Sequence, residues 1–223
     1  MYLDISIKDQ ILIPQPNYAA AKIHAKIIDD RLGLQCEKIE SEINSELNKD
    51  KLGPSLGQNF WYGLDIQSLQ TPYSEIVEMI HFIKPKSDDT WIDLGAGYGR
   101  MGITLGLIAP DVNFIGYEYV QPRVDEGNRV LQQLSFTQAQ IKHMDISKED
   151  FQLPQAQLYF LYDFGSREDV YKIFEKLKSE AKNKPIQVVA RGRGVRNWIL
   201  MDCPWLCEVH SPVHFSNWSY FKS

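Results

Sequence analysis

The segment with the clearest chemical potential is residues 90–100, which read Thr-Trp-Ile-Asp-Leu-Gly-Ala-Gly-Tyr-Gly-Arg. A short apolar run ends in Asp93 and continues directly into glycines at Gly95, Gly97 and Gly99. Glycine has no Cβ atom, so the chain can turn tightly and its backbone can approach a ligand closely. A helix predicted from Arg100 to about Ala109 would add unpaired N–H groups and a positive dipole end. The charge of Asp93 favours a ligand with a cationic amine over one that carries only phosphate.

Acidic residues also follow later apolar runs, at Glu118, Asp145 and Asp163. Glu118 comes 19 residues after Gly99 (118 − 99), close to the roughly 20 expected for an acid that binds ribose hydroxyls. Any one of these acids alone is equally well explained as a cap or a solvated loop residue. Together with Asp93 they predict a nucleoside cofactor bound through its hydroxyls, its adenine amino group and a cationic amine.

Two cofactors compete for this site. Gly97, Gly99 and Gly102 satisfy the G-x-G-x-x-G dinucleotide fingerprint, which predicts a nicotinamide cofactor. In that fingerprint the first glycine follows the strand directly, yet Gly95 already occupies this place, and Asp93 would repel a pyrophosphate. S-adenosylmethionine, which carries an amino acid and a sulfonium, fits the pattern better.

The elements that must position these residues alternate between strands and helices from Thr90 onward. Strands are predicted at 91–94, 113–118, 140–144, 158–162 and 186–190, with helices at about 123–134 and 167–181 between them. This rhythm indicates a parallel sheet with helices on both faces, whose ligand binds beyond the carboxyl ends of the strands. The tail, with 206–210 and 215–221 around Pro212, predicts a closing antiparallel hairpin.

The N-terminal part is predicted to be helical. Residues 18–47 lack proline and carry apolar residues at mixed three- and four-residue spacing, with a break at Gly33. A helical cap, or functionally a lid, is favoured over a dimerising coiled coil because sustained heptads are absent. Residues 51–57 read as a linker. We therefore expect an N-terminal extension over 1–57 and a cofactor-binding domain over 58–223, with a helix that starts at Thr71 as N-cap and runs to about Ile83.

The composition is that of an ordinary soluble protein. The chain has 223 residues, 43% hydrophobic and 12% aromatic, which is enough to bury a substantial core. Its net charge of −5 argues against a general nucleic-acid binder. No apolar run approaches the roughly 20 residues of a membrane span, and the first residues do not resemble a targeting peptide. We expect a cytoplasmic protein without a membrane partner, and the three cysteines fit reduced thiols.

One potential metal site needs weighing. Cys203, Cys207, His210 and His214 read C-x3-C-x2-H-x3-H, and zinc accepts these ligand types. An alternating strand over 206–210 would send Cys207 and His210 to opposite faces. We therefore predict strand packing and no metal.

The run from Asp93 to Arg100, with Gly116-Tyr117-Glu118 downstream, resembles motif I and the acidic loop of class I, seven-strand methyltransferases that use S-adenosylmethionine. The resemblance covers about 59–223. It implies a doubly wound, mostly parallel seven-stranded sheet of the Rossmann-like type with an antiparallel C-terminal hairpin. It further implies that Thr71 and Tyr73 close over the cofactor and that Glu118 binds its ribose. The methionine part would be held by Asp93, Gly95, Ala96 and Gly97, and the adenine by Asp145 with Ile146.

Within that superfamily, residues 71–75 (Thr-Pro-Tyr-Ser-Glu) and the Gly-Arg ending of motif I resemble the non-SET protein lysine methyltransferases. The histone enzymes of that group carry an asparagine-rich motif after strand four, where this chain has Tyr162-Asp163-Phe164-Gly165-Ser166. We expect Asp163 to orient an acceptor amine and Tyr162 and Phe164 to wall its channel, although packing alone is the commoner fate of such rings.

The predicted function is therefore methyl transfer from S-adenosylmethionine to a protein lysine. A small-molecule acceptor and a cofactor-binding interaction module without catalysis are the alternatives. Arg191, Arg193 and Arg196 form the local basic cluster near the predicted site. They fit a solvated loop or, alternatively, a grip for an acidic protein segment or a phosphate-bearing substrate.

Overall fold

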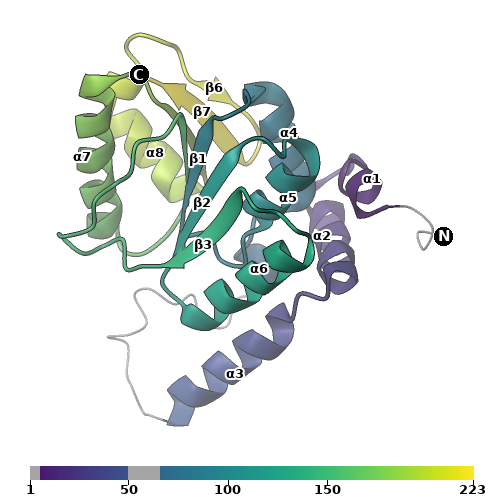
Figure 1. Ribbon diagram of the computed structural model, residues 1–223. Helices are drawn as coiled ribbons and strands as arrows, with labels where there is room; N and C mark the ends of the chain where they lie inside the picture. The colour runs from purple at the N-terminus through teal and green to yellow at the C-terminus, as the bar shows by residue number, and fades with distance from the viewer. Residues whose placement is uncertain (1–5, 50–65) are drawn as a thin grey trace.

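A computed structural model describes residues 6–49 and 66–223 of the protein, which contain a seven-stranded sheet (Figure 1). The strand order is β3-β2-β1-β4-β5-β7-β6. All neighbours are parallel except β7, which runs antiparallel to both β5 and β6. The strands are β1 (Thr90–Leu94), β2 (Asn113–Glu118), β3 (Ala139–His143), β4 (Leu158–Tyr162), β5 (Gln187–Arg191), β6 (Val213–His214) and β7 (Trp218–Lys222). The predicted doubly wound sheet with an antiparallel C-terminal hairpin is confirmed.

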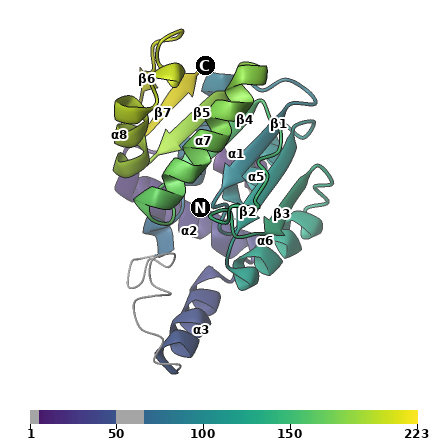
Figure 2. The same cartoon turned by 90° about the vertical axis from the view of Figure 1, so that its left-hand side faces the viewer.

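Helices cover both faces of the sheet (Figure 1, Figure 2). They are α1 (Ile7–Ile11), α2 (Tyr18–Leu32), α3 (Cys36–Lys49), α4 (Tyr73–Ile83), α5 (Arg100–Ile108), α6 (Gln121–Gln133), α7 (Arg167–Asn183) and α8 (Arg193–Asp202), with short 3₁₀ helices η1 (Ile66–Ser68) and η2 (Pro204–Leu206). The sheet separates two apolar cores. Helices α4, α5 and α6 contribute to one of them, and α7 and α8 to the other.

The central strand shows why the sequence folds this way. Trp91 of β1 packs in the core beside α4 and α5, whereas Ile92 and Leu94 pack in the opposite core. Strands buried on both faces read as nearly continuous apolar runs, as β1 and β4 do. The chain leaves β1 towards β2 on one side and returns as β4 on the other, so the carboxyl end of β1 is the topological switch point where ligands bind.

The N-terminal helices share the core of the α4 face. Helix α2 ends at Gly33, whose φ of 68° places it in the left-handed region, as the predicted break requires. Ile11, Ile28 and Leu32 are buried together with Met79 of α4. Helix α3 lies against α6 and projects beyond the sheet (Figure 1). The predicted boundary between residues 57 and 58 lies outside the described residues.

Two sequence-based expectations about local structure are wrong. Pro72, not Thr71, is the N-cap of α4, because its ψ of 145° is extended and the helix begins only at Tyr73. Residues 206–210 do not form a strand, since Pro204 opens the 3₁₀ helix η2, in which the Leu206 amide donates to the Cys203 carbonyl at 3.0 Å. The hairpin consists of β6 and β7 instead.

Because residues 206–210 form no strand, the alternation argument against a metal site fails. Cys203 packs in the core beside α8, and the His214 Nδ1 lies 2.8 Å from the Ser219 hydroxyl. Within residues 6–49 and 66–223, no group of three His, Cys, Asp or Glu side chains could hold a metal ion. In the same part of the chain, no helix is long and apolar enough to span a bilayer.

Candidate functional site

The turn after β1 depends on its glycines. Gly95, Gly97 and Gly99 have φ values of 95°, 54° and 76°, all in the region that favours glycine. The amides of Gly95 and Ala96 both donate to the Tyr117 carbonyl at 2.9 Å, which joins the turn to β2. Gly99 is the N-cap of α5. The glycines thus place the helix start directly beyond the switch point.

Replacing Gly99 with alanine should lower the free energy of unfolding by about 2–4 kcal/mol, through left-handed strain and overpacking. The added Cβ would lie 2.5 Å from the Ile141 Cδ1. Gly33→Ala is the matched control, because its φ of 68° is similar but no described atom lies within 4 Å of the new Cβ. That variant should lose only about 1–2 kcal/mol. Urea unfolding of both proteins measures the difference, and equal losses would show that the Ile141 contact is accommodated.

Two adjoining cavities open at the carboxyl ends of the parallel strands, with volumes of about 270 Å³ and 30 Å³. Leu69, Gly95, Gly97 and Tyr162 line both of them. Of the residues predicted for the site, the larger cavity adds Glu118, Asp145, Ile146, Asp163 and Phe164. The smaller one adds Thr71, Asp93 and Ala96. The fold thus brings together all the predicted residues except Tyr73, which is not among the described lining residues.

Asp93 is a buried acid in the smaller cavity. Its side chain points towards the α4 face, and the residue is only 4% exposed. Burial, with a smaller contribution from the charge of Glu118, raises the pKa of Asp93 to about 8. Within the described residues, its Oδ1 has no hydrogen-bond partner. A buried acceptor without a donor is uncommon, and an ammonium group in the cavity would satisfy it.

Glu118 joins β2 to the glycine turn. Its Oε2 accepts a hydrogen bond from the Gly97 amide and its Oε1 one from the Val120 amide, both at 2.9 Å. A carboxylate offers about four lone-pair sites, so these two bonds leave capacity for hydroxyl donors. Glu118 can therefore both hold the turn in place and accept from a ribose.

Asp145 and Ile146 follow β3 and form a polar–apolar pair on the wall of the larger cavity. The Asp145 Oδ1 accepts from the Ser147 amide at 3.1 Å and from its hydroxyl at 2.6 Å, an Asx-type turn. Ile146 is 8% exposed. This combination suits a flat heterocycle with an exocyclic amino group.

The end of β4 and the segment after it line the larger cavity together with Glu118. The Tyr162 hydroxyl donates to the Ser68 carbonyl at 2.8 Å, and the Phe164 Cβ lies 3.5 Å from the position of a Cβ on Gly95. Asp163 accepts from the Val195 amide at 2.8 Å and more weakly from the Gly194 amide at 3.4 Å. Both of its oxygens thus face the first turn of α8, where the helix dipole favours a negative charge.

Several lining residues were not predicted from the sequence: Ser68, Leu69, Tyr119, Arg123, Met144, Ser147, Gly165 and Asp169. Arg123 could have been predicted from the sequence, because it follows Glu118 by only five residues (123 − 118) and a cation so close to an acid can pair with it. Ser68 and Leu69 could not have been predicted, since no sequence pattern marks them. Contacts with residues far away in the sequence, such as the Tyr162 hydroxyl, position this segment.

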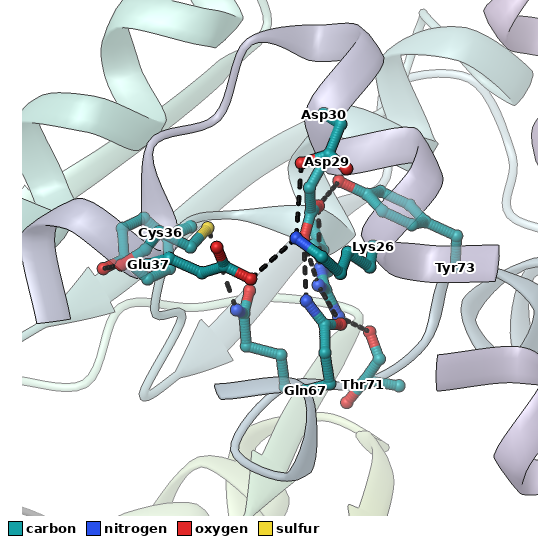
Figure 3. A network of polar contacts seen from close by, with 11 residues as sticks. Lys26, Asp29, Asp30, Cys36, Glu37, Gln67, Thr71 and Tyr73 are labelled. Carbon is teal, nitrogen blue, oxygen red and sulfur yellow. Dashed lines mark hydrogen bonds and ion pairs between the residues drawn. The ribbon is translucent and has the colours of Figure 1, made fainter. Parts of the chain in front are cut away.

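The start of α5 is fastened to α2 by a buried polar network, centred on Asp29 (Figure 3). Tyr73 is fully buried, and its hydroxyl donates to the Asp29 Oδ1 at 2.8 Å. Arg100 forms an ion pair with the same carboxylate through Nη2, and its Nε lies 3.2 Å from Oδ1. Arg100 also donates to the Thr71 carbonyl at 3.3 Å. Tyr73 is thus placed to support the cavity wall from behind.

The arginine cluster is part of the fold rather than a solvated loop, because helix α8 begins at Arg193. Arg191 is 3% exposed and donates to the Glu75 carboxylate at 2.8 Å and to the Tyr18 hydroxyl at 3.2 Å. Arg196 donates to the Ser219 hydroxyl at 2.9 Å and to two carbonyls of the β6–β7 turn. Two of the three arginines are thus occupied by the protein itself, which weakens the case for a phosphate grip.

No protein-family model and no curated protein matches this chain. Solved structures do resemble it. A SAM-dependent O-methyltransferase from Thermotoga maritima is 17% identical with a TM-score of 0.52 and covers 69% of this chain and 65% of its own. An RNA methyltransferase from Salinibacter ruber, solved with S-adenosyl-L-homocysteine, is 16% identical with a TM-score of 0.50 and coverages of 69% and 91%. TrmN from Thermus thermophilus is 10% identical with a TM-score of 0.50 and coverages of 77% and 52%.

Structural similarity at sequence identities this low shows the fold of the chain and leaves the methyl acceptor open. The chain therefore has the Rossmann-like fold of the class I methyltransferases that use S-adenosylmethionine.

Proposed function

We propose that the protein is an S-adenosylmethionine-dependent methyltransferase. The observation that carries this proposal is the Oδ1 of buried Asp93, which has no partner among the described residues. It lies in a small cavity that adjoins a larger one lined by Glu118 and Asp145. When bound, the cofactor supplies a methyl group activated by its sulfonium. Asp93 would hold the ammonium group, with Thr71, Gly95, Ala96 and Gly97 around the methionine part. Glu118 would accept from the ribose, and Asp145 with Ile146 would hold the adenine.

A nicotinamide dinucleotide is a poorer match to the same residues. Its pyrophosphate would have to approach the glycine turn beside Asp93, and the Gly97 amide already donates to Glu118 at 2.9 Å. The site thus presents carboxylates where a dinucleotide fold presents free N–H groups.

We propose a protein lysine as the acceptor, because the larger cavity is both acidic and aromatic. Beside Glu118 and Asp145, which are assigned to the cofactor, its described lining includes the carboxylates of Asp163 and Asp169. Their negative charge attracts a cationic acceptor and repels a phosphate. Tyr162 and Phe164 add apolar surface, which disfavours the ammonium form of a lysine. This matters because deprotonating a free lysine at pH 7 costs about 4.6 kcal/mol.

The residues of this chain would act by alignment. Methyl transfer is an in-line displacement that needs orientation and the exclusion of water more than proton transfer. Tyr162 is held by Ser68 on one side and by the Arg191 guanidinium, 4.4 Å from its ring centre, on the other. Burial raises the pKa of Tyr162, so it remains a neutral phenol and serves as a wall rather than as a base.

Incubation with methyl-labelled S-adenosylmethionine and a cell lysate tests the acceptor, with Asp93→Ala as the inactive control. We expect labelled protein bands whose hydrolysate contains methyl-lysine. Label confined to small molecules would replace the lysine proposal with a small-molecule acceptor. Tight binding of S-adenosylhomocysteine without any transfer would identify an interaction module, an outcome that the occupation of Asp163 by α8 makes worth testing.

A further inference from the structure

A single carboxylate on α3, that of Glu40, contacts Arg123, which lines the larger cavity, and Tyr98 of the glycine turn. The Glu40 Oε1 accepts from the Arg123 Nε at 2.7 Å, and its Oε2 accepts from the Arg123 Nη2 at 3.0 Å. The Oε1 also accepts from the hydroxyl of Tyr98, which lies between Gly97 and Gly99, at 2.8 Å. The Glu40 side chain is 12% exposed and that of Arg123 16%. This geometry is a bidentate, charge-assisted pair in a largely desolvated place.

Arg123 is shared between two acids. Its remaining nitrogen, Nη1, lies 3.7 Å from the Glu118 Oε1, close enough for electrostatic attraction but too far for a hydrogen bond. Glu118 instead accepts from two backbone amides. The acid that binds the guanidinium through two nitrogens therefore decides where it lies, and that acid is Glu40.

We infer that Glu40 is a positioning residue of the cofactor site, which holds Arg123 away from Glu118 so that Glu118 stays available to ribose hydroxyls. This inference rests on the proposed function. Without the charge of Glu40, the guanidinium would be drawn fully onto Glu118, since attraction is strong where water is scarce. Arg123 would then occupy the lone pairs that a ribose needs. The N-terminal extension would thus tune cofactor affinity without touching the cofactor.

A purely structural role for Glu40 makes a different prediction. If Glu40 only fastens α3 to α6, replacing Arg123 in addition to Glu40 cannot restore cofactor binding. If Glu40 restrains Arg123, then replacing Arg123 with methionine in a Glu40→Gln background removes the competitor and restores binding. Methionine keeps most of the aliphatic packing of arginine and carries no charge.

Calorimetry with S-adenosylhomocysteine on wild type, Glu40→Gln, Arg123→Met and the double variant tests the inference. We expect Glu40→Gln to bind about tenfold more weakly or worse, as for loss of one charged hydrogen bond. The double variant should recover to within about threefold of Arg123→Met. Glu42→Gln, on the same helix in an exposed pair with Lys38, should bind like wild type.

Each outcome either supports or overturns the positioning role of Glu40. A double variant as weak as Glu40→Gln, or a Glu40→Gln that binds like wild type, overturns the positioning role while leaving the methyltransferase proposal intact. Failure of the wild-type protein to bind S-adenosylhomocysteine overturns both. Thermal unfolding of the four proteins identifies any that fail to fold, and a folded Glu40→Gln with weakened binding is the expected result.

Discussion

Replacing Asp93 with asparagine should stabilise the protein against unfolding at pH 7 while removing its affinity for S-adenosylhomocysteine. The folded-state pKa of Asp93 is about 8, against 3.8 for an exposed aspartate. Below pH 4 both states are protonated and burial carries no ionisation penalty. As pH rises from about 4 to about 8, only the unfolded state releases the proton, so the wild type loses stability.

At pH 7 this penalty approaches about 4 kcal/mol, and asparagine, which cannot ionise, avoids it. Urea unfolding should therefore show a gain for Asp93→Asn at pH 7 that shrinks to about 1 kcal/mol at pH 4.5. Asp111→Asn, at an exposed position, is the control and should change stability by less than about 0.5 kcal/mol at either pH. A gain independent of pH would refute the ionisation argument.

The same acid should couple cofactor binding to proton release. In the free protein at pH 7 Asp93 is largely protonated, because its pKa is about 8. An ammonium group beside it would lower that pKa and drive the proton off. The calorimetric enthalpy of S-adenosylhomocysteine binding should then vary with the ionisation enthalpy of the buffer. Asp93→Asn should bind at least about 100-fold more weakly, since a buried charged pair contributes about 3 kcal/mol or more, and retention of wild-type affinity would contradict the proposed role.

Replacing Asp29 with asparagine should lower the free energy of unfolding by about 3–5 kcal/mol, because it leaves Arg100 charged and unpaired in the interior. Both side chains of this ion pair are 3% exposed. The Tyr73 hydroxyl, 2.8 Å from Asp29, would also lose its charged acceptor. Urea unfolding measures the loss.

The neighbouring residue on α2 offers a matched control. Asp30 pairs with Lys26 at 3.5 Å, but the two side chains are 63% and 44% exposed. Asp30→Asn should therefore cost less than about 1 kcal/mol, as exposed pairs do. Similar losses for the two variants would mean that the Asp29–Arg100 pair is not a buried anchor.

Much of the sheet could be predicted because its signals are local. β4 occupies 158–162 as expected, and the alternation of strands and helices indicated the parallel sheet. Helix α8 was not predicted because the glycines of Arg-Gly-Arg-Gly disfavour a helix. The Val195 amide in its first turn donates to Asp163, which is more than 30 residues away in the sequence. A capping residue that follows a distant strand cannot be recognised from the sequence near the helix.

The residues of the site also divide into those that could be predicted from local sequence and those that could not. Asp93, the glycines and the strand-end acids were visible because each is defined by its position relative to one strand. The support behind them was not, since Arg100 meets Asp29 across 71 residues and Arg123 meets Glu40 across 83. Long-range ion pairs depend on the finished fold, and a single sequence carries no periodicity that reveals them.

The contact between Tyr18 and Arg191 has a consequence for biosynthesis. These residues are 173 positions apart, and Arg191 also packs on the ring of Tyr162 in the cavity wall. During translation, the first helices emerge long before their partner on β5 exists. The wall around Tyr162 therefore lacks this arginine until β5 has left the ribosome, so that nascent chains shorter than this should not retain the cofactor.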